Sequence, residues 1–305
     1  MQYAYRLLGA VVLLMTFISG TGASSGQKSF ATPEDAVRAF VTSLKSDNEE
    51  ELLSIFGKDG KSLIFSGDPV SDKQRREKFI SDFDQKNSIV QEGAKMVLVI
   101  GDRDWPFPVP LAKKGERWIF DTRAGKEEIL DRRIGENEYS TVETLMAIVD
   151  AQREYAMNDS NANRVREYAE TFMSYPGQKN GLYWKTKEGE KQSPLGELVA
   201  DAQAEGYSSN GARQGPIAFH GYYFRMLKKQ GKHAPGGAYD YMVNNQMIGG
   251  FAVVAYPAAY GSSGVMTFIV NHRGVVYEKN LGKDTVKIAG ALASFDPDDT
   301  WKKVE

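Results

Sequence analysis

The 305-residue sequence contains no cysteine, so it has no disulfide, no thiolate nucleophile or metal ligand, and no cysteine for a lipid anchor. It has only 3 histidines, and their spacing fits no metal motif. It also lacks a basic excess, because 38 lysines and arginines stand against 40 aspartates and glutamates. A general nucleic-acid binder needs that excess to displace counterions from phosphates. We therefore expect no nucleic-acid partner.

The first 23 residues have the pattern of a secretory signal peptide. Arg6 precedes an uncharged run over 7–18, and small residues follow over 19–23. The run is too short for a stable membrane anchor, although an uncleaved amphipathic anchor is the alternative. Later in the chain no apolar run reaches about 18 residues. We therefore expect an exported protein, periplasmic or extracellular, that does not span a membrane after processing.

Residues 24–30 predict a polar tether, and residues 31–135 predict an N-terminal α+β domain. The elements expected in this domain are helices that begin at Thr32, at Asp47 or Asn48 and at Ser71-Asp72, a buried strand over 96–100, and a hairpin over 109–120. Helices followed by a small antiparallel sheet resemble NTF2-like and cystatin-like domains.

Residues 136–305 predict a second α+β domain. A capping box at residues 140–143 indicates a helix that reaches about Met157. The further elements expected are helices over 165–173 and 193–206, strands over 219–227, 251–256, 265–270 and 275–278, and a tight connection over 271–274. A long helix followed by an antiparallel meander resembles the globular heads of pilin-like proteins, an analogy of fold alone.

One segment has the oxygen spacing of a calcium-binding EF-hand loop. Side-chain oxygens fall at the first, third, fifth, ninth and twelfth positions, from Asp159, Asn161, Asn163, Glu167 and Glu170. Arg164 stands where the motif needs glycine for its sharp turn. A solvated linker is therefore the default interpretation, and calcium is the one cofactor that the sequence suggests.

His220 is the candidate general base of the chain, beside Tyr222 at the start of an aromatic strand. A hydrolase would pair it with a carboxylate, for which the candidates are Asp150, Glu154, Glu136 and Glu138. The alternative is a histidine whose hydrogen bonds are satisfied at the end of a sheet.

Aromatic and arginine side chains form the candidate binding surface. Trp105 and Phe107 alternate in a proline-rich extended segment, which either presents aromatic rings or protects a sheet edge. Arg132 and Arg133 either hold an anionic ligand or form an interdomain salt-bridge network. Aromatic residues of the second half complete the surface, with core packing as the alternative: Trp184, Tyr222 and Tyr260.

Long and specific segments run through the mature chain. They are SGDPVSD (66–72), DWPFPVPL (104–111), WIFDTRAGKEEILDRRIGENE (118–138), VDAQREYA (149–156), GLYW (181–184), SPLGELVADA (193–202), HGYYFRML (220–227), GGFAVVAYPAAYGSSGVMTFIVN (249–271) and FDPDDTWKKV (295–304). In these segments the chain resembles a bacterial family, domain of unknown function 2950. The resemblance implies an exported protein of unassigned activity and supplies no catalytic residues.

The sequence favours a non-catalytic envelope module, with a binding or structural role, that meets an envelope protein or a cell-wall component. The reason is that aromatic and proline-rich segments are present, whereas no matched set of nucleophile, base and orienting residue is recognisable. A periplasmic hydrolase that uses His220 and a calcium-stabilised module are the alternatives.

Overall fold

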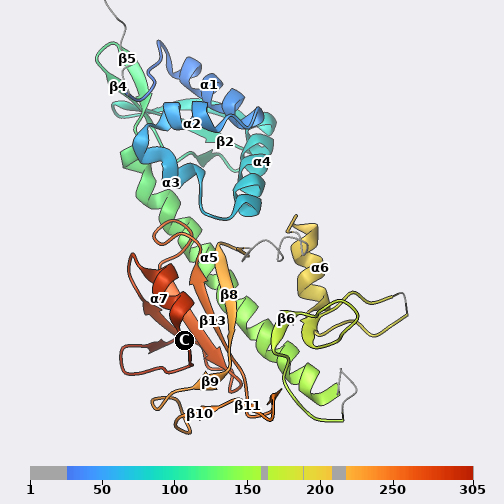
Figure 1. Cartoon of the computed structure of the whole chain (residues 1–305). Coiled ribbons are helices and arrows are strands. Elements are labelled where there is room, and N and C mark those ends of the chain that lie inside the picture. The colour runs from blue at the N-terminus through green and yellow to red at the C-terminus, as the bar shows by residue number, and fades with distance from the viewer. Residues whose placement is uncertain (1–25, 159–163, 188, 208–217, 305) are drawn as a thin grey trace, which may run out of the picture.

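The computed structural model describes residues 26–158, 164–187, 189–207 and 218–304. The predicted leader, residues 1–23, lies outside these ranges. Two clusters of buried apolar side chains form the core, one within residues 30–120 and the other within residues 145–295. The long helix α5 (Thr122–Asn158) runs from one cluster to the other (Figure 1). The chain is therefore a mixed α+β protein, as its sequence predicts.

The N-terminal unit begins with helices whose caps can be read from the sequence. These helices are α1 (Pro33–Lys45), α2 (Glu49–Phe56), the short 3-10 helix η1 (Lys58–Gly60), α3 (Lys61–Ile64) and α4 (Pro69–Gln85). The side chains of Thr32 and Asn48 accept hydrogen bonds at the starts of α1 and α2, so both predicted starts are confirmed. The predicted start of α4 at Ser71-Asp72 is wrong, because Asp68 caps this helix and Pro69 occupies its first turn.

An antiparallel sheet completes the N-terminal unit. Its strands are β1 (Asn87–Glu92), β2 (Lys95–Ile100), β3 (Trp105–Pro106), β4 (Leu111–Lys114) and β5 (Arg117–Phe120). They follow the order β1-β2-β4-β5, with β3 also paired to β2. The predicted buried strand and hairpin are confirmed. The ring of Phe40 lies at the centre of the helix–sheet core, with four other phenylalanine rings at 5.2–5.5 Å between centroids.

The described part of the predicted tether, residues 26–30, is packed onto the N-terminal core. Phe30 is buried, and its backbone exchanges hydrogen bonds with Trp118 at 2.8 and 2.9 Å. The side chain of Gln27 donates to the carbonyl oxygens of Ile55 and Phe120. The segment is polar in composition, but Phe30 at its end is buried. Residues 27–30 are therefore packed against the core and do not form a free tether.

Helix α5 begins 18 residues before the predicted capping box at residues 140–143, which lies in the helix interior. The capping-box interpretation is therefore wrong, and the boundary expected between residues 135 and 136 falls within a continuous helix. The segment 125–138 lacks a continuous apolar period, and within it Ile129 packs against the N-terminal cluster. Its glutamate, lysine, arginine and leucine residues nevertheless favour a helix. Although α5 is long, no helix in the described ranges combines the length and apolar character needed to cross a membrane.

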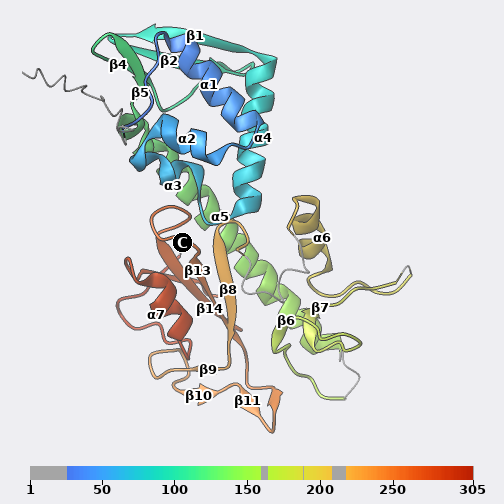
Figure 2. The same cartoon turned by 45° about the horizontal axis from the view of Figure 1, so that its top comes forward.

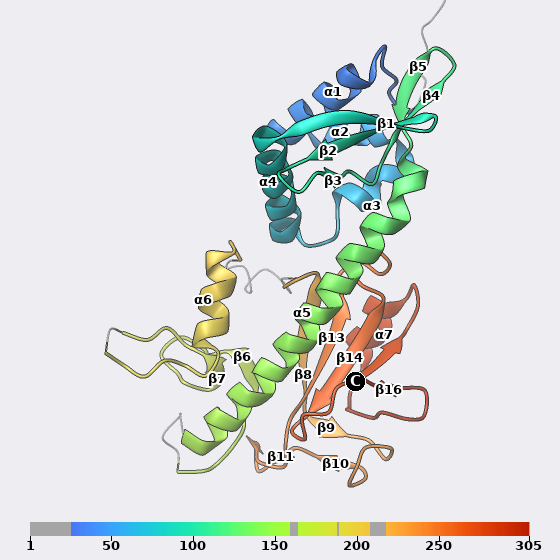
Figure 3. The same cartoon turned by 180° about the vertical axis from the view of Figure 1, so that it is seen from behind.

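The C-terminal unit is a second antiparallel sheet, in the order β16-β15-β14-β13-β8. Its strands are β8 (Tyr222–Leu227), β13 (Ala252–Pro257), β14 (Met266–Asn271), β15 (Tyr277–Asn280) and β16 (Lys302–Lys303). Helix α5 and the short α7 (Thr285–Ala291) lie on opposite faces of this sheet, which explains why every residue of β13 is buried (Figures 1 and 3). Gly274 has a φ of 76° in the predicted tight connection after β14.

Short elements surround this sheet. They are β6 (Thr171–Met173), β7 (Gly181–Tyr183), α6 (Gly196–Ala204), β9 (Lys229–Gln230), β10 (Tyr239–Asp240), β11 (Met242–Val243) and β12 (Gln246–Met247). The predicted helix over 165–173 is wrong: residues 171–173 form a strand that pairs in parallel with β7. The aromatic and β-branched residues Tyr168, Thr171 and Phe172 favour an extended backbone over a helix.

The two units meet beside the middle of α5 (Figure 2). Polar contacts join them there. Asn137 donates to the carbonyl oxygen of Ser263 at 2.8 Å. The carboxylate of Asp68, at the start of α4, accepts from the hydroxyl of Tyr207 at 2.7 Å and from the backbone N–H of Gly221 at 2.8 Å. The start of α4 is therefore fixed to the second unit, and this contact also fixes one side of the cavity described next.

Candidate functional site

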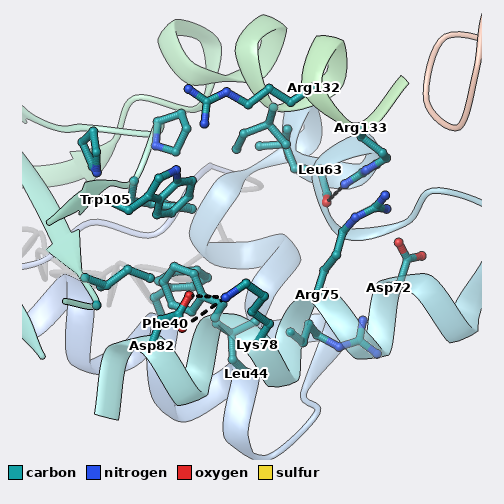
Figure 4. A pocket seen from close by; sticks show the side chains of 18 of the residues that line it. Phe40, Leu44, Leu63, Asp72, Arg75, Lys78, Asp82, Trp105, Arg132 and Arg133 are labelled. Carbon is teal, nitrogen blue, oxygen red and sulfur yellow. Dashed lines mark hydrogen bonds and ion pairs between the residues drawn. The ribbon is translucent and has the colours of Figure 1, made fainter. Parts of the chain in front are cut away.

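A cavity of about 860 Å³ lies in the N-terminal unit where α4, α5 and the segment 101–108 meet (Figure 4). Most of its wall is apolar. The apolar side chains include Phe40, Leu44, Phe56, Leu63, Phe79, Ile100, Trp105, Phe107 and Ile129. Charged side chains of α4 and α5 lie around its border, among them Arg75, Lys78, Asp82, Arg132, Arg133 and Glu136. The cavity is thus amphipathic, with an aromatic interior and a charged border.

The proline-rich segment forms one wall of this cavity. Trp105 pairs with Ile100 at the sheet edge, and the backbone N–H of Phe107 donates to the carbonyl oxygen of Leu98 at 2.7 Å. The alternation then turns Phe107 into the phenylalanine core and leaves Trp105 36% exposed at the cavity. Gly125 permits this arrangement, because a Cβ there would overlap the carbonyl group of Pro108. The segment is therefore a short edge strand that also presents one aromatic ring.

Arg133 is a buried cation at the charged border of the cavity. Its two Nη atoms donate to the carbonyl oxygens of Ser62 at 2.7 Å and Leu63 at 2.6 Å. Among the described residues, no carboxylate oxygen lies within 4.0 Å of its guanidinium. Burial and, next, the positive charge of Arg75 lower the pKa of Arg133 to about 10. Hydrogen bonds to neutral groups fix the position of this charge without an ion pair.

Arg75 lies beside Arg133 and comes from α4 (Figure 4). Its Nη2 donates to the amide oxygen of Asn137 at 3.1 Å and is 3.6 Å from an exposed carboxylate oxygen of Glu136. Its Nη1 is buried and has no hydrogen-bond partner. Two guanidinium groups therefore lie together. The negative charges near them are Glu136 and the buried carboxylate of Asp72, but the charge of Arg75 lowers the pKa of Arg133 more than the charge of Asp72 raises it.

The other basic side chains of α4 and α5 at the cavity each have a closer acid. Arg76 pairs with Asp47 at 3.2 Å and Lys78 with Asp82 at 3.0 Å, while Arg132 pairs with Glu128 one helical turn away. These are exposed or half-exposed pairs, which stabilise a protein little but neutralise each other's charge. The positive potential is therefore concentrated at Arg75 and Arg133.

The structure brings four of the predicted binding residues to this one cavity: Trp105, Phe107, Arg132 and Arg133. The other three lie elsewhere. Tyr222 is fully buried and donates to the carbonyl oxygen of Met266 at 2.9 Å, while Tyr260 donates to Asn280 at 3.1 Å. Trp184 packs against the C-terminal core with the ammonium of Lys179 at 5.4 Å from its ring. These three do not form a common surface with the cavity.

His220, the candidate base, lies at the junction of the units and does not line the cavity. Its ring contacts Phe219 at 4.1 Å between centroids, and its Nε2 is 3.7 Å from a carboxylate oxygen of Glu205. Glu205 is not one of the carboxylates that the sequence suggested as partners. A φ of 47° at His220 places its backbone N–H towards the hydroxyl of Tyr207 at 3.2 Å, so the backbone of this residue belongs to the junction.

Three of the predicted calcium ligands, Asp159, Asn161 and Asn163, lie outside the described residues. The other two, Glu167 and Glu170, lie within them, and Glu170 forms an ion pair with Lys228 at 2.6 Å. Within the ranges that the structure describes, no group of three or more histidine, aspartate or glutamate side chains is arranged to hold a metal ion. The calcium hypothesis stays a prediction for the segment 159–163.

Sequence reasoning missed Arg75, which α4 brings beside Arg133. The available signal was helical spacing: Asp72, Arg75, Phe79 and Asp82 recur at three or four residues and all line the cavity. An arginine on the same helix face as an inward-pointing phenylalanine is the pattern that indicates an amphipathic cavity. The adjacent pair Arg132-Arg133 lies on α5 and does not by itself indicate that Arg75 of α4 lies beside it.

Fold and site together define a two-unit α+β protein with an amphipathic cavity in its first unit. Over residues 27–304 the chain matches the family described as "Protein of unknown function (DUF2950)", and it belongs to that family. No curated protein and no solved structure matches it. The NTF2-like, cystatin-like and pilin-like names therefore stay predictions beyond the general α+β architecture.

Proposed function

We propose that this protein is an exported, non-catalytic binding module whose N-terminal cavity takes an elongated apolar small molecule. The observation that carries the proposal is the open, phenylalanine-lined cavity of about 860 Å³. Protein interiors are normally close-packed, and small-molecule sites typically measure ~300–1,000 Å³. Binding of an apolar ligand in such a volume is favourable because the ligand removes the apolar side chains from contact with water.

The lining supports binding over catalysis. The described residues that border the cavity include no serine, threonine, cysteine or histidine, and therefore no hydroxyl, thiol or imidazole to attack a substrate or to move its proton. Each lining acid has a partner: Asp82 pairs with Lys78, and Asp102 accepts from Gln85 at 2.5 Å. Asp72 accepts from the backbone N–H of Ser66 at 2.9 Å, and Glu136 is 3.6 Å from Arg75. These contacts favour a carrier or sensor of a small molecule.

Export is the second part of the proposal, and the leader pattern of residues 1–23 supports it. In the periplasm or outside the cell, apolar small molecules derive from envelope lipids and cell-wall precursors. An envelope protein or a cell-wall component is the partner that this location offers. Cell fractionation with N-terminal sequencing of the mature protein tests this part independently of the cavity.

Titration with dodecan-1-ol tests the cavity. We expect saturable binding by isothermal titration calorimetry to the chain that begins at residue 24, together with a change in the fluorescence of Trp105. Ile129→Trp places a large ring in the cavity and should weaken binding at least tenfold, a cost of about 1.4 kcal/mol. Ile288→Trp, on the exposed face of α7 and outside the cavity lining, is the matched control and should bind like the unaltered protein.

Two results would refute this function. One is the absence of saturable binding by the unaltered, folded protein. The other is equal affinity of both tryptophan variants, because that would place the bound alcohol outside the cavity. Circular dichroism of the variants establishes that each is folded before its affinity is compared.

A further inference from the structure

We infer that the occupant of this cavity is an amphipathic anion whose carboxylate or phosphate head binds Arg75 against the fixed charge of Arg133, while its apolar tail extends towards Trp105. This inference rests on the proposed function and adds the chemical class of the ligand. Three features of the charged border carry it: the pairing of the two arginines, the unequal neutralisation of the basic residues, and the geometry of the apolar wall.

The first feature is the proximity of Arg75 and Arg133 (Figure 4). Arg133 is 5% exposed, and its Nη atoms are held by two carbonyl oxygens, so the charge cannot turn away to solvent. A buried charge without an ion pair is costly, and for Arg133 the neighbouring charge of Arg75 adds more to that cost than the charge of Asp72 relieves. An anion at this point would compensate both charges at once.

The second feature is that, of the cavity-lining cations on α4 and α5 that have an ion pair, Arg75 has the longest one. Its acid, Glu136, is 72% exposed and 3.6 Å away, and its Nη1 donates to no acceptor. An oxyanion can displace that exposed carboxylate with little loss and can accept a bidentate, charge-assisted pair from the guanidinium. Arg133 then acts as a fixed positive charge behind the head group rather than as a direct donor.

The third feature is the direction of the apolar wall. Phe79 and Ile129 line the cavity one helical turn from Arg75 and Arg133 respectively, and the segment that carries Trp105 forms another part of the same wall. The side chains of Arg132 and Trp105 lie together at the far side, where Arg132 already has Glu128 as its ion-pair partner (Figure 4). A ligand with its charge at one end and an alkyl chain along this wall matches the distribution of polar and apolar groups.

The test compares three probes of one alkyl length at low ionic strength: dodecanoate and dodecyl phosphate below their micelle concentrations, and dodecan-1-ol below its solubility limit. We expect the better anion to bind the unaltered protein at least tenfold more tightly than the alcohol, because charge-assisted hydrogen bonds exceed neutral ones. A stronger response to dodecanoate assigns a carboxylate head, and a stronger response to dodecyl phosphate assigns a phosphate head.

The variants Arg75→Gln and Arg38→Gln form the matched pair. Arg75 lines the cavity, whereas Arg38 is an exposed residue of α1 outside the cavity lining. Arg75→Gln should remove the preference for the anion, whereas Arg38→Gln should keep it. Should Arg75→Gln fail to fold, added salt gives the second measurement, since 0.5 M sodium chloride should weaken anion binding, but not alcohol binding, by about an order of magnitude.

The outcomes separate the inference from the function on which it rests. If none of the three probes binds, the proposed function fails. If the alcohol and the anions bind equally, if Arg75→Gln keeps the preference, or if salt affects all probes alike, the inference is overturned while the apolar binding function stands.

Discussion

Asp68→Asn is the most informative test of the junction that supports the cavity. One carboxylate oxygen of Asp68 accepts from the backbone N–H groups of Val70 and Ser71 and caps α4 at 3.1 Å. The other accepts from Tyr207 and Gly221 of the second unit. The substitution keeps size and shape and replaces one acceptor by an N–H donor.

The expected loss of stability depends on which way the amide introduced by Asp68→Asn is oriented. If its oxygen keeps the cap, its nitrogen faces the N–H of Gly221, and two donors then meet in a buried site. The Tyr207 hydroxyl can turn and accept, so the loss is one hydrogen bond to a charged acceptor with one N–H left unsatisfied. We expect a destabilisation of about 2–4 kcal/mol. The opposite orientation sacrifices two cap bonds and costs no less.

Asp121→Asn is the matched control, because this aspartate accepts from the N–H of Ala124 in the first turn of α5 and its other oxygen pairs with a half-exposed Lys95. Asparagine caps a helix as well as aspartate does, so the expected cost is below ~1 kcal/mol. Thermal unfolding followed by circular dichroism should separate the two variants by roughly 4–10 °C. Equal shifts would show that the second oxygen of Asp68 contributes nothing, and would refute the described junction.

Two further predictions concern the C-terminal unit. Gly264→Ala places a Cβ against the hydroxyl of buried Tyr222 and should lower the free energy of unfolding, measured with urea, by ~2 kcal/mol or more. Gly290→Ala, in a helix with open space around it, is the control and should be neutral or stabilising. The reverse ranking would contradict this packing. Burial, and next the charge of Glu138, raise the pKa of Glu278 above its usual 4.5, so ionisation of Glu278 destabilises the folded state as the pH rises above 4.5. Glu278→Gln should therefore raise the melting temperature at pH 7.5 and lose this gain below pH 4.5. A gain independent of pH would contradict the assignment.

Local signals predict local elements well in this chain. Thr32-Pro33 predicts the start of α1, and Asp68-Pro69 has the same pattern at the start of α4. The start predicted at Ser71-Asp72 is three residues too late. The tight connection at Gly274 and the strands around it follow from turn chemistry and from β-branched composition. In each case neighbouring residues determine the conformation, so one sequence is sufficient.

Features that depend on distant contacts could not be predicted. The helix α5 continues through its charged half and connects two cores. Each of those cores forms from residues that are distant in the sequence, so local patterns do not reveal them. Similarly, Phe107 and Arg133 were recognisable as unusual residues, but their common cavity depends on α4 bringing Phe79 and Arg75 to the same place. Helical spacing gives the face of a helix, whereas the partner of that face is a property of the tertiary structure.

The most direct test of the central claim is a crystal structure with dodecanoate brominated at its terminal carbon, in which anomalous scattering locates the bromine. The account predicts bromine density beside Trp105 and the carboxylate at Arg75. An empty cavity at saturating ligand, or a bromine bound elsewhere on the protein, would contradict it.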